Sequence, residues 1–297
     1  MTDTETALRS FLIPGRVEAR TENGQLPKLL LSTAGSTAEL YLHGAQVTYF
    51  QKQSERPLLF MSAQSYFAPD KPIRGGVPII FPWFGPRDGA AAHGFARTAA
   101  WSLVDSSATN NETRVTLELA QATDLGEWPA HRLRYRVTVS DVLRLELEVT
   151  NNSTARELAH ESCLHTYFAI GDIHTTRIAG LQGACYLDKV DNFVEKTETA
   201  AEIAITGETD RVYLNTDSTV TIIDPLWHRR IVVEKSGSRS TVVWNPWIAK
   251  AKAMADFGDD EYQRMLCVES GNVDRDRLAL APGPSSTLST TLRSELF

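Results

Sequence analysis

Apolar and polar residues alternate along several short stretches of the chain. Arg114–Leu119, Arg134–Val139 and Leu143–Val149 each carry an apolar residue at every second position. This is the period of a strand that buries one of its two faces. Ser140 and Asp141, between the last two stretches, are typical of a tight hairpin turn. The pattern predicts neighbouring antiparallel strands whose apolar faces lie on a core.

Similar β-like runs recur in the second half of the chain, at Thr219–Ile223, Arg230–Glu234, Thr241–Trp244, Met265–Val268 and Thr287–Leu292. Helical periodicity is limited to two short segments, Leu8–Leu12 and Trp247–Phe257. We find no internal repeat and no linker-like segment. We therefore expect an all-β, mainly antiparallel fold, a large β-sandwich with few short helices. It should form a single domain over residues 1–297, with residues 1–20 as a loosely ordered N-terminal segment.

The composition and the net charge indicate which kinds of molecule the protein can bind. The 297 residues include 42% apolar and 23% charged residues, enough to bury a substantial core. A net charge of −7 argues against nucleic acid or an anionic membrane as partner and leaves a small molecule. The acidic N-terminus does not resemble an export signal, and three cysteines without C-x-x-C spacing suit reduced thiols. We expect a cytoplasmic protein and, without an interface pattern, a monomer.

The segment HESCLHTYF, His160–Phe168, nearly matches the zinc motif His-Glu-x-x-His. Its histidines, His160 and His165, are five residues apart. They would point about 140° apart on a helix and to opposite faces of a strand, so this segment alone cannot hold a metal. Taken alone, His165 fits a hydrogen-bonded core histidine, and a functional role requires partners elsewhere. We assign His160 and Glu161 to structure.

Three further segments carry candidate chemistry. Arg74–Pro86 (RGGVPIIFPWFGP) offers Trp83 and Phe84 as flat surfaces for a sugar ring, and Arg74 with Arg97 suits a phosphate or carboxylate. The alternative is a Gly/Pro-rich loop with solvent-exposed arginines.

Glu269, at the end of a predicted strand in CVESG, could act as a base if burial raised its pKa. The alternative is an edge glutamate or an internal ion pair. Asp210 in ETDRVYLN could cap a turn or accept hydrogen bonds from sugar hydroxyls. Dinucleotide, P-loop, GxSxG and EF-hand motifs are absent from the sequence.

In this order, seven segments resemble the hexose-6-phosphate mutarotases (glucose-6-phosphate 1-epimerases), a branch of the aldose 1-epimerase superfamily. They are RGGVPIIFPWFGP, HGFAR, LHTYFAIGDI, ETDRVYLN, WNPW, MADF and CVESG. The resemblance implies a galactose-mutarotase-like β-sandwich and an isomerase that needs neither cofactor nor metal.

By position, the resemblance implies that His165 is the acid, Glu269 the base and Arg74 and Arg97 the phosphate ligands. It likewise implies that Asp210 is a sugar ligand and His93 a pocket histidine. Two positions depart from the family pattern: Ala92, where some members carry Gln, and Ser270, where Pro is frequent.

The expected reaction interconverts the α and β anomers of hexose 6-phosphates, chiefly D-glucose 6-phosphate. Glu269 would take the proton of the C1 hydroxyl while His165 protonates the ring oxygen. One alternative is a non-catalytic carbohydrate- or sugar-phosphate-binding protein on the same fold. Another is a glycoside hydrolase or lyase. A hydrolase could use Asp210 and Glu269 as its carboxylate pair, which would leave His165 without a role.

Overall fold

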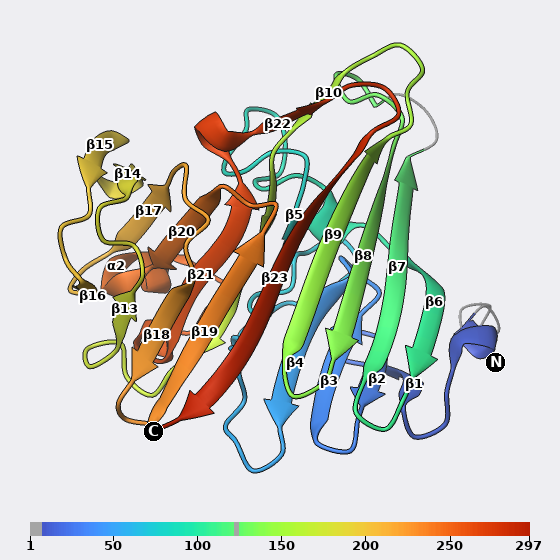
Figure 1. Ribbon diagram of the computed structural model, residues 1–297, viewed down its shortest axis with the longest axis horizontal. Helices are drawn as coiled ribbons and strands as arrows, with labels where there is room; N and C mark the ends of the chain where they lie inside the picture. The colour runs from blue at the N-terminus through green and yellow to red at the C-terminus, as the bar shows by residue number, and fades with distance from the viewer. Residues whose placement is uncertain (1–7, 122–124) are drawn as a thin grey trace.

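A computed structural model describes residues 8–121 and 125–297 as a sandwich of antiparallel sheets (Figure 1). The nine-stranded sheet forms one layer. In sheet order its strands are β16 (Glu202–Ala204), β13 (Arg177–Ala179), β18 (Val220–Asp224), β19 (Arg229–Ser236), β23 (Ser285–Leu296), β9 (Leu143–Asn151), β8 (His131–Val139), β7 (Thr113–Gln121) and β6 (Ser102–Ala108).

An eight-stranded and a four-stranded sheet lie side by side against this layer. The eight-stranded sheet contains β15 (Val194–Thr197), β14 (Cys185–Asp188), β17 (Thr209–Tyr213), β20 (Ser240–Asn245), β21 (Met265–Asn272), β11 (Ser162–Leu164) and β5 (Ile79–Ile80), with β12 (Tyr167–Ala169) also paired to β21. The four-stranded sheet contains β1 (Val17–Glu22), β2 (Leu26–Ser32), β3 (Ser36–Tyr41) and β4 (Gln46–Lys52).

The remaining elements are short. β10 (Leu158–His160) and β22 (Leu278–Leu280) form a two-stranded ladder. The α-helix α2 spans Trp247–Ala253, and the 3₁₀ turns are Arg9–Phe11, Ala96–Thr98, Lys189–Asp191, Glu261–Arg264 and Asp274–Asp276. No helix of the described residues is long and apolar enough to cross a membrane.

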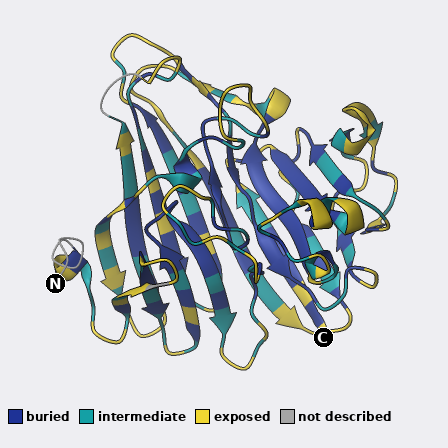
Figure 2. Ribbon diagram, turned by 180° about the vertical axis from the view of Figure 1, so that it is seen from behind, coloured by how far each residue is buried: buried dark blue, intermediate teal, exposed yellow. Residues whose placement is uncertain are grey.

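The predicted all-β sandwich is confirmed, and the alternation explains how its layers pack. Tyr135 and Val137 of β8 lie opposite Leu147 and Leu145 of β9, and all four are fully buried. The residues between them are charged and face outward, where Arg136 and Glu146 pair across the strands at 3.6 Å. Buried residues fill the strands of both layers, whereas exposed ones gather in the loops (Figure 2).

Seven of the eight predicted strand runs lie wholly in strands, the eighth begins one residue before β18, at Thr219, and the predicted turn at Ser140–Asp141 joins β8 to β9. The predicted helix at Trp247–Phe257 is shorter than expected, because α2 ends at Ala253. In the predicted helix at Leu8–Leu12, Leu8 is helical and Arg9–Phe11 form a 3₁₀ turn. Residues 1–7 of the predicted N-terminal segment lie outside the described residues. Residues 17–20 of that segment belong to β1.

Candidate active site

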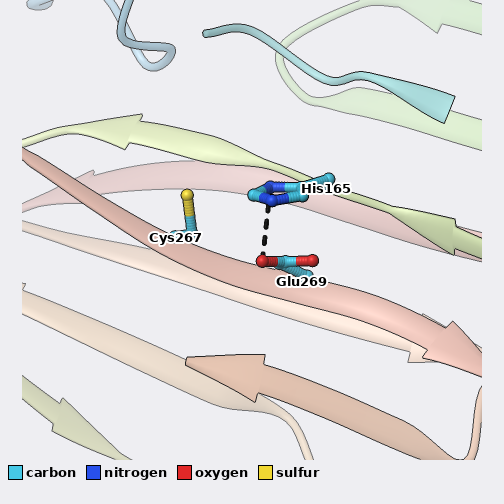
Figure 3. A group of neighbouring side chains, drawn as sticks. All are labelled: His165, Cys267 and Glu269. Atoms are coloured by element: carbon cyan, nitrogen blue, oxygen red, sulfur yellow. Dashed lines mark ion pairs between the residues drawn. The ribbon is translucent and has the colours of Figure 1, made fainter. Parts of the chain in front are cut away.

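His165 and Glu269 face each other because of the strand register. Leu164 of β11 lies opposite Ser270 of β21, and Tyr167 of β12 lies opposite Cys267. The same register continues through the residues between β11 and β12, so it places His165 across from Glu269. Cross-strand neighbours project from the same face of a sheet. Accordingly, Nδ1 of His165 lies 3.3 Å from Oε1 of Glu269 (Figure 3).

Both groups are buried: Glu269 is 1% exposed and His165 8%. Burial raises the pKa of Glu269 well above 4.5, and the negative charge of Asp210 adds to this shift. Burial also lowers the pKa of His165 well below 6.5, with further repulsion from His93, Arg74 and Arg97. Low polarity therefore disfavours a full charge on either partner, and the two groups titrate as a coupled pair.

A second residue contacts the Glu269 carboxyl group. The sulfhydryl of Cys163 in β11 donates a hydrogen bond to Oε2 of Glu269, with a sulfur–oxygen distance of 3.4 Å. Cys163 lies opposite Gly271, where a Cβ atom would come within 2.9 Å of the Cys163 sulfur. The glycine of CVESG thus leaves room for the cysteine side chain.

The face that carries this pair forms the floor of a cavity of about 490 Å³, a size suited to a small ligand. Its lining includes the predicted catalytic pair and the predicted substrate-binding residues Arg74, His93, Arg97 and Asp210. The full lining is Arg74, Phe84, Gly85, Pro86, Ala92, His93, Arg97, His165, Tyr167, Lys189, Phe193, Asp210, Trp244, Lys250, Met254 and Glu269.

The two predicted phosphate ligands differ in their surroundings. Arg74 donates from Nε and Nη2 to Oδ2 of Asp256, at 3.1 and 3.0 Å, and from Nη1 to the Tyr167 hydroxyl at 3.0 Å. Arg97 donates to the Ala92 carbonyl oxygen and, within the described chain, forms no ion pair. Burial lowers the pKa of Arg97 to about 10. A bound anionic ligand would therefore provide Arg97 with the ion-pair partner that the described residues do not provide.

Other polar groups surround the cavity. Lys189 pairs with Asp210, with 3.1 Å between Nζ and Oδ2, and Lys250 pairs with Glu208 at 2.8 Å. Burial raises the pKa of Asp210, although Lys189 counteracts part of that shift. Asp210 faces Trp244, which in turn faces Cys267, so these three side chains form a row across β17, β20 and β21.

His93 is placed by its loop. The Gly85 backbone N–H donates to Nδ1 of His93 at 3.2 Å, so the proton of the neutral ring is on Nε2. Burial lowers the pKa of His93 to about 3. The next residue, Gly94, has φ of +70°, and a Cβ atom there would lie 2.0 Å from the Phe81 carbonyl oxygen. Glycine is required for this close approach.

The two residues that suggested a zinc motif lie elsewhere. His160 packs against Phe81, and its ring does not reach the His165 cavity. Glu161 accepts hydrogen bonds from the backbone N–H groups of Phe84 and Asp274 and so ties two loops together. Trp83 also differs from expectation: its indole stacks on Trp128 at 5.0 Å and does not line this cavity, whereas Phe84 does.

Sequence reasoning missed Lys189, Lys250, Phe193 and the Cys163 contact. No motif surrounds these residues, and only the strand order brings them to the cavity.

The structure is thus an antiparallel sandwich in which an imidazole and a carboxyl group face each other at the floor of a cavity that charged side chains also line. The aldose 1-epimerase family model matches residues 27–293. The chain belongs to the aldose 1-epimerase family.

Three individual proteins are similar to this chain over most of its length. A Cenchrus ciliaris protein named "Putative glucose-6-phosphate 1-epimerase" is 37% identical over 294 residues, covering 92% of this chain and 89% of the relative. An Escherichia coli K12 protein with the same name is 33% identical and covers 86% of each chain. A crystal structure from Salmonella typhimurium, described as a "putative mutarotase", superposes with a TM-score of 0.89 at 30% identity, covering 97% of this chain and 96% of that one.

Proposed function

We propose that the protein interconverts the α and β anomers of hexose 6-phosphates, chiefly D-glucose 6-phosphate, with Glu269 as base and His165 as acid. The observation that carries this proposal is the 3.3 Å approach of His165 to Glu269 in a cavity that also holds the Arg97 guanidinium, which has no ion-pair partner among the described residues. The names of the Cenchrus and Escherichia relatives support the choice of a sugar phosphate.

The reaction needs one proton removed from the C1 hydroxyl and one delivered to the ring oxygen. In the active form the pair holds a single proton, on His165, and Glu269 is a carboxylate. Glu269 takes the hydroxyl proton while His165 protonates the ring oxygen, and the C1–O5 bond breaks to give the open-chain aldehyde. Rotation about C1–C2 and closure with both proton transfers reversed give the other anomer. Positioned proton transfer of this type accelerates a reaction typically about 10²–10⁴-fold.

Burial of His165 and Glu269 makes both proton transfers more favourable. A carboxyl group with a raised pKa is a stronger base once ionised, and an imidazolium with a lowered pKa is a stronger acid. The single proton can also lie on Glu269 with His165 neutral, and transfer across 3.3 Å connects the two forms. The pair therefore needs no other proton donor.

A phosphate dianion would assist this pair. Arg74 and Arg97 both lower the pKa of His165 by repulsion. A phosphate bound at these guanidinium groups would offset that repulsion and favour the protonated imidazole. We assign Arg97 as the principal phosphate ligand, with Arg74 beside it on Asp256. Asp210 is assigned to sugar hydroxyls, and His93, through its Nε2–H group, to a sugar oxygen.

Three accompanying expectations remain proposals: a cytoplasmic location, a monomeric state and activity without cofactor or metal. The free thiols of Cys163, Cys185 and Cys267 support a reducing compartment.

Anomer-resolved exchange NMR with α-D-glucose 6-phosphate tests the proposal. We expect interconversion well above the buffer rate, and slower exchange with free glucose. No acceleration with any hexose 6-phosphate, together with measurable binding, would instead support the carbohydrate-binding alternative.

A further inference from the structure

His165, Glu269 and Cys267 form a compact group of three different donor types. Their ligand atoms all lie within 4.8 Å of one another, and the three residues are buried. Cys267 and Glu269 are two residues apart on β21 and project from the same face, where the Glu269 carboxyl group faces the imidazole and the Cys267 sulfur stands to one side of it (Figure 3). The zinc motif suggested by His160 and His165 does not exist, yet His165 takes part in a different set of donors.

The spacing of two of these donors matches a metal site. Tetrahedral zinc binds histidine nitrogen and carboxylate oxygen at about 2.0–2.1 Å, which places two such ligand atoms about 3.3 Å apart. Nδ1 of His165 and Oε1 of Glu269 are 3.3 Å apart. Both atoms are buried and neither has a hydrogen-bond partner of good geometry among the described residues.

The third donor completes the usual ligand number. A zinc–sulfur bond of about 2.3 Å requires separations near 3.5 Å between the sulfur and the other donors. The donor atoms of the three residues lie within 4.8 Å of one another. A movement of the Cys267 sulfur by at most about 1.3 Å therefore brings it to this separation.

We propose that His165, Cys267 and Glu269 bind a thiophilic divalent cation, for which Zn²⁺ is the representative, and that the metal-bound protein cannot epimerise sugars. Mixed sulfur, nitrogen and oxygen donors select zinc-like ions over magnesium or calcium. Thiolate and carboxylate together neutralise the two positive charges of the ion. Three protein ligands leave a fourth position for water on the cavity side.

A bound metal should inhibit epimerisation because two of its ligands are the proposed catalytic residues. A metal on Nδ1 of His165 and on the Glu269 carboxylate occupies both groups to which proton transfer is assigned, and this part of the inference rests on the proposed function. Binding requires loss of the Cys267 thiol proton, so affinity should increase with pH. Arg74 and Arg97 oppose a cation nearby, which favours reversible over permanent occupation.

Of the two other cysteines, Cys185 provides a matched control and Cys163 does not, because Cys163 contacts Glu269. Cys185 is exposed and lies on β14, away from the group. Cys163 contacts the other oxygen of Glu269, Oε2, and is not part of the three-donor group. Adventitious binding to an accessible thiol would follow Cys185, whereas binding at the proposed site follows Cys267.

The test titrates the full-length protein with Co²⁺, a spectroscopic probe that occupies tetrahedral zinc sites, and follows the near-ultraviolet thiolate-to-cobalt band. Equilibrium dialysis with Zn²⁺ gives stoichiometry. We expect one metal per chain in the wild type and in Cys185→Ser, and at least about tenfold weaker binding with no thiolate band in Cys267→Ser. Cys267→Ala serves as a second variant if the serine disturbs folding, which near-UV circular dichroism reports.

Zn²⁺ should also stop anomer exchange in the wild type, EDTA should restore it, and Cys267→Ser should resist inhibition while retaining exchange without metal. Absence of the band in the wild type, or an equal band in Cys267→Ser, would overturn the metal site. The two proposals fail separately: cobalt binding without any epimerase activity refutes the proposed function alone, and activity without cobalt binding refutes the metal site alone.

Discussion

Cys163 and Glu269, 106 residues apart in sequence, are joined by a sulfhydryl hydrogen bond of 3.4 Å in the interior of the eight-stranded sheet. The donor reaches Oε2, and the other carboxyl oxygen faces His165. A sulfhydryl is a weak donor, so it orients the carboxyl group without strongly stabilising its charge. The geometry of the pair thus depends on a residue outside any recognised site motif.

The roles of the pair can be tested by removing one proton-transferring group at a time. Glu269→Gln and His165→Asn remove the proposed base and the proposed acid while keeping a polar side chain, so kcat for hexose 6-phosphate exchange should fall about 10²–10⁴-fold. Binding of the sugar phosphate, measured by calorimetry, should change little. His174→Asn, at an exposed histidine outside the cavity, is the control. Retention of activity in either pair variant would refute the assigned roles.

The Cys163 contact predicts a change in pH profile. The sulfhydryl hydrogen bond lowers the pKa of Glu269 against the larger effect of burial. Cys163→Ala removes this contribution, so the acidic limb of kcat/KM should move to higher pH. Cys163→Ser introduces a stronger donor and should move the limb to lower pH. Two profiles identical to the wild type would show that the contact does not affect the carboxyl group.

The two arginines should respond differently to substitution. Arg97→Gln removes a partly buried cation that has no ion-pair partner in the described structure, so KM should rise at least about tenfold for sugar phosphates and much less for free sugars. Arg74→Gln also leaves Asp256 unpaired, so we expect an additional loss of about 1–3 kcal/mol in the free energy of unfolding.

Arg87→Gln is the matched control for both arginines, because Arg87 lies in the same loop region but lines a different cavity. Equal losses for phosphorylated and free sugars in Arg97→Gln would argue against phosphate binding.

Glu269 should also make stability depend on pH. Its folded-state pKa lies above the unfolded value of about 4.5, so the folded protein keeps this proton longer than the unfolded chain does. The contribution of this group to stability is therefore complete below about pH 4.5 and is lost as pH rises through the folded-state pKa.

Glu269→Gln should consequently be more stable than the wild type, by a margin that grows from acidic toward neutral pH. Urea unfolding at about pH 5 and about pH 8 measures both margins. An equal margin at the two values would contradict a raised pKa.

The fit between Cys163 and Gly271 predicts an overpacking effect. The Cβ atom of Gly271→Ala would lie 2.9 Å from the Cys163 sulfur and 3.0 Å from the Ser162 carbonyl oxygen. We expect a loss of about 1–3 kcal/mol in unfolding free energy and reduced activity, because the cysteine is displaced from Glu269. Cys163→Ala combined with Gly271→Ala should recover part of the stability, and a double-mutant cycle measures the coupling.

The sequence predicted the fold because alternation is a local signal. The polar residues on either side of Val137 and Leu145 in sequence indicate that these two side chains face the core. This inference does not require knowing which strands pair. The candidate site was predicted only as a set of separate segments. Its geometry depends on β21 pairing with both β11 and β12, which no local pattern specifies.

For the same reason, the environment of Arg74 could not be predicted. Asp256 is 182 residues away, and nothing in either segment indicates that they meet. Trp83 and Phe84 are adjacent in sequence, yet only Phe84 lines the cavity. Residue type predicted which side chains could bind substrate or transfer a proton. Tertiary contacts determine which of these side chains are already paired with another residue of the protein.

The register that places His165 opposite Glu269 has a consequence for the order of events in folding. The two residues are 104 positions apart along the chain, and they meet only after β21 has joined strands formed much earlier in the sequence. Such long loop closures are slow steps. Epimerase activity regained on dilution from urea should therefore lag behind the return of the far-UV β signal. Recovery of enzyme turnover would then measure the rate at which β21 pairs with β11 and β12.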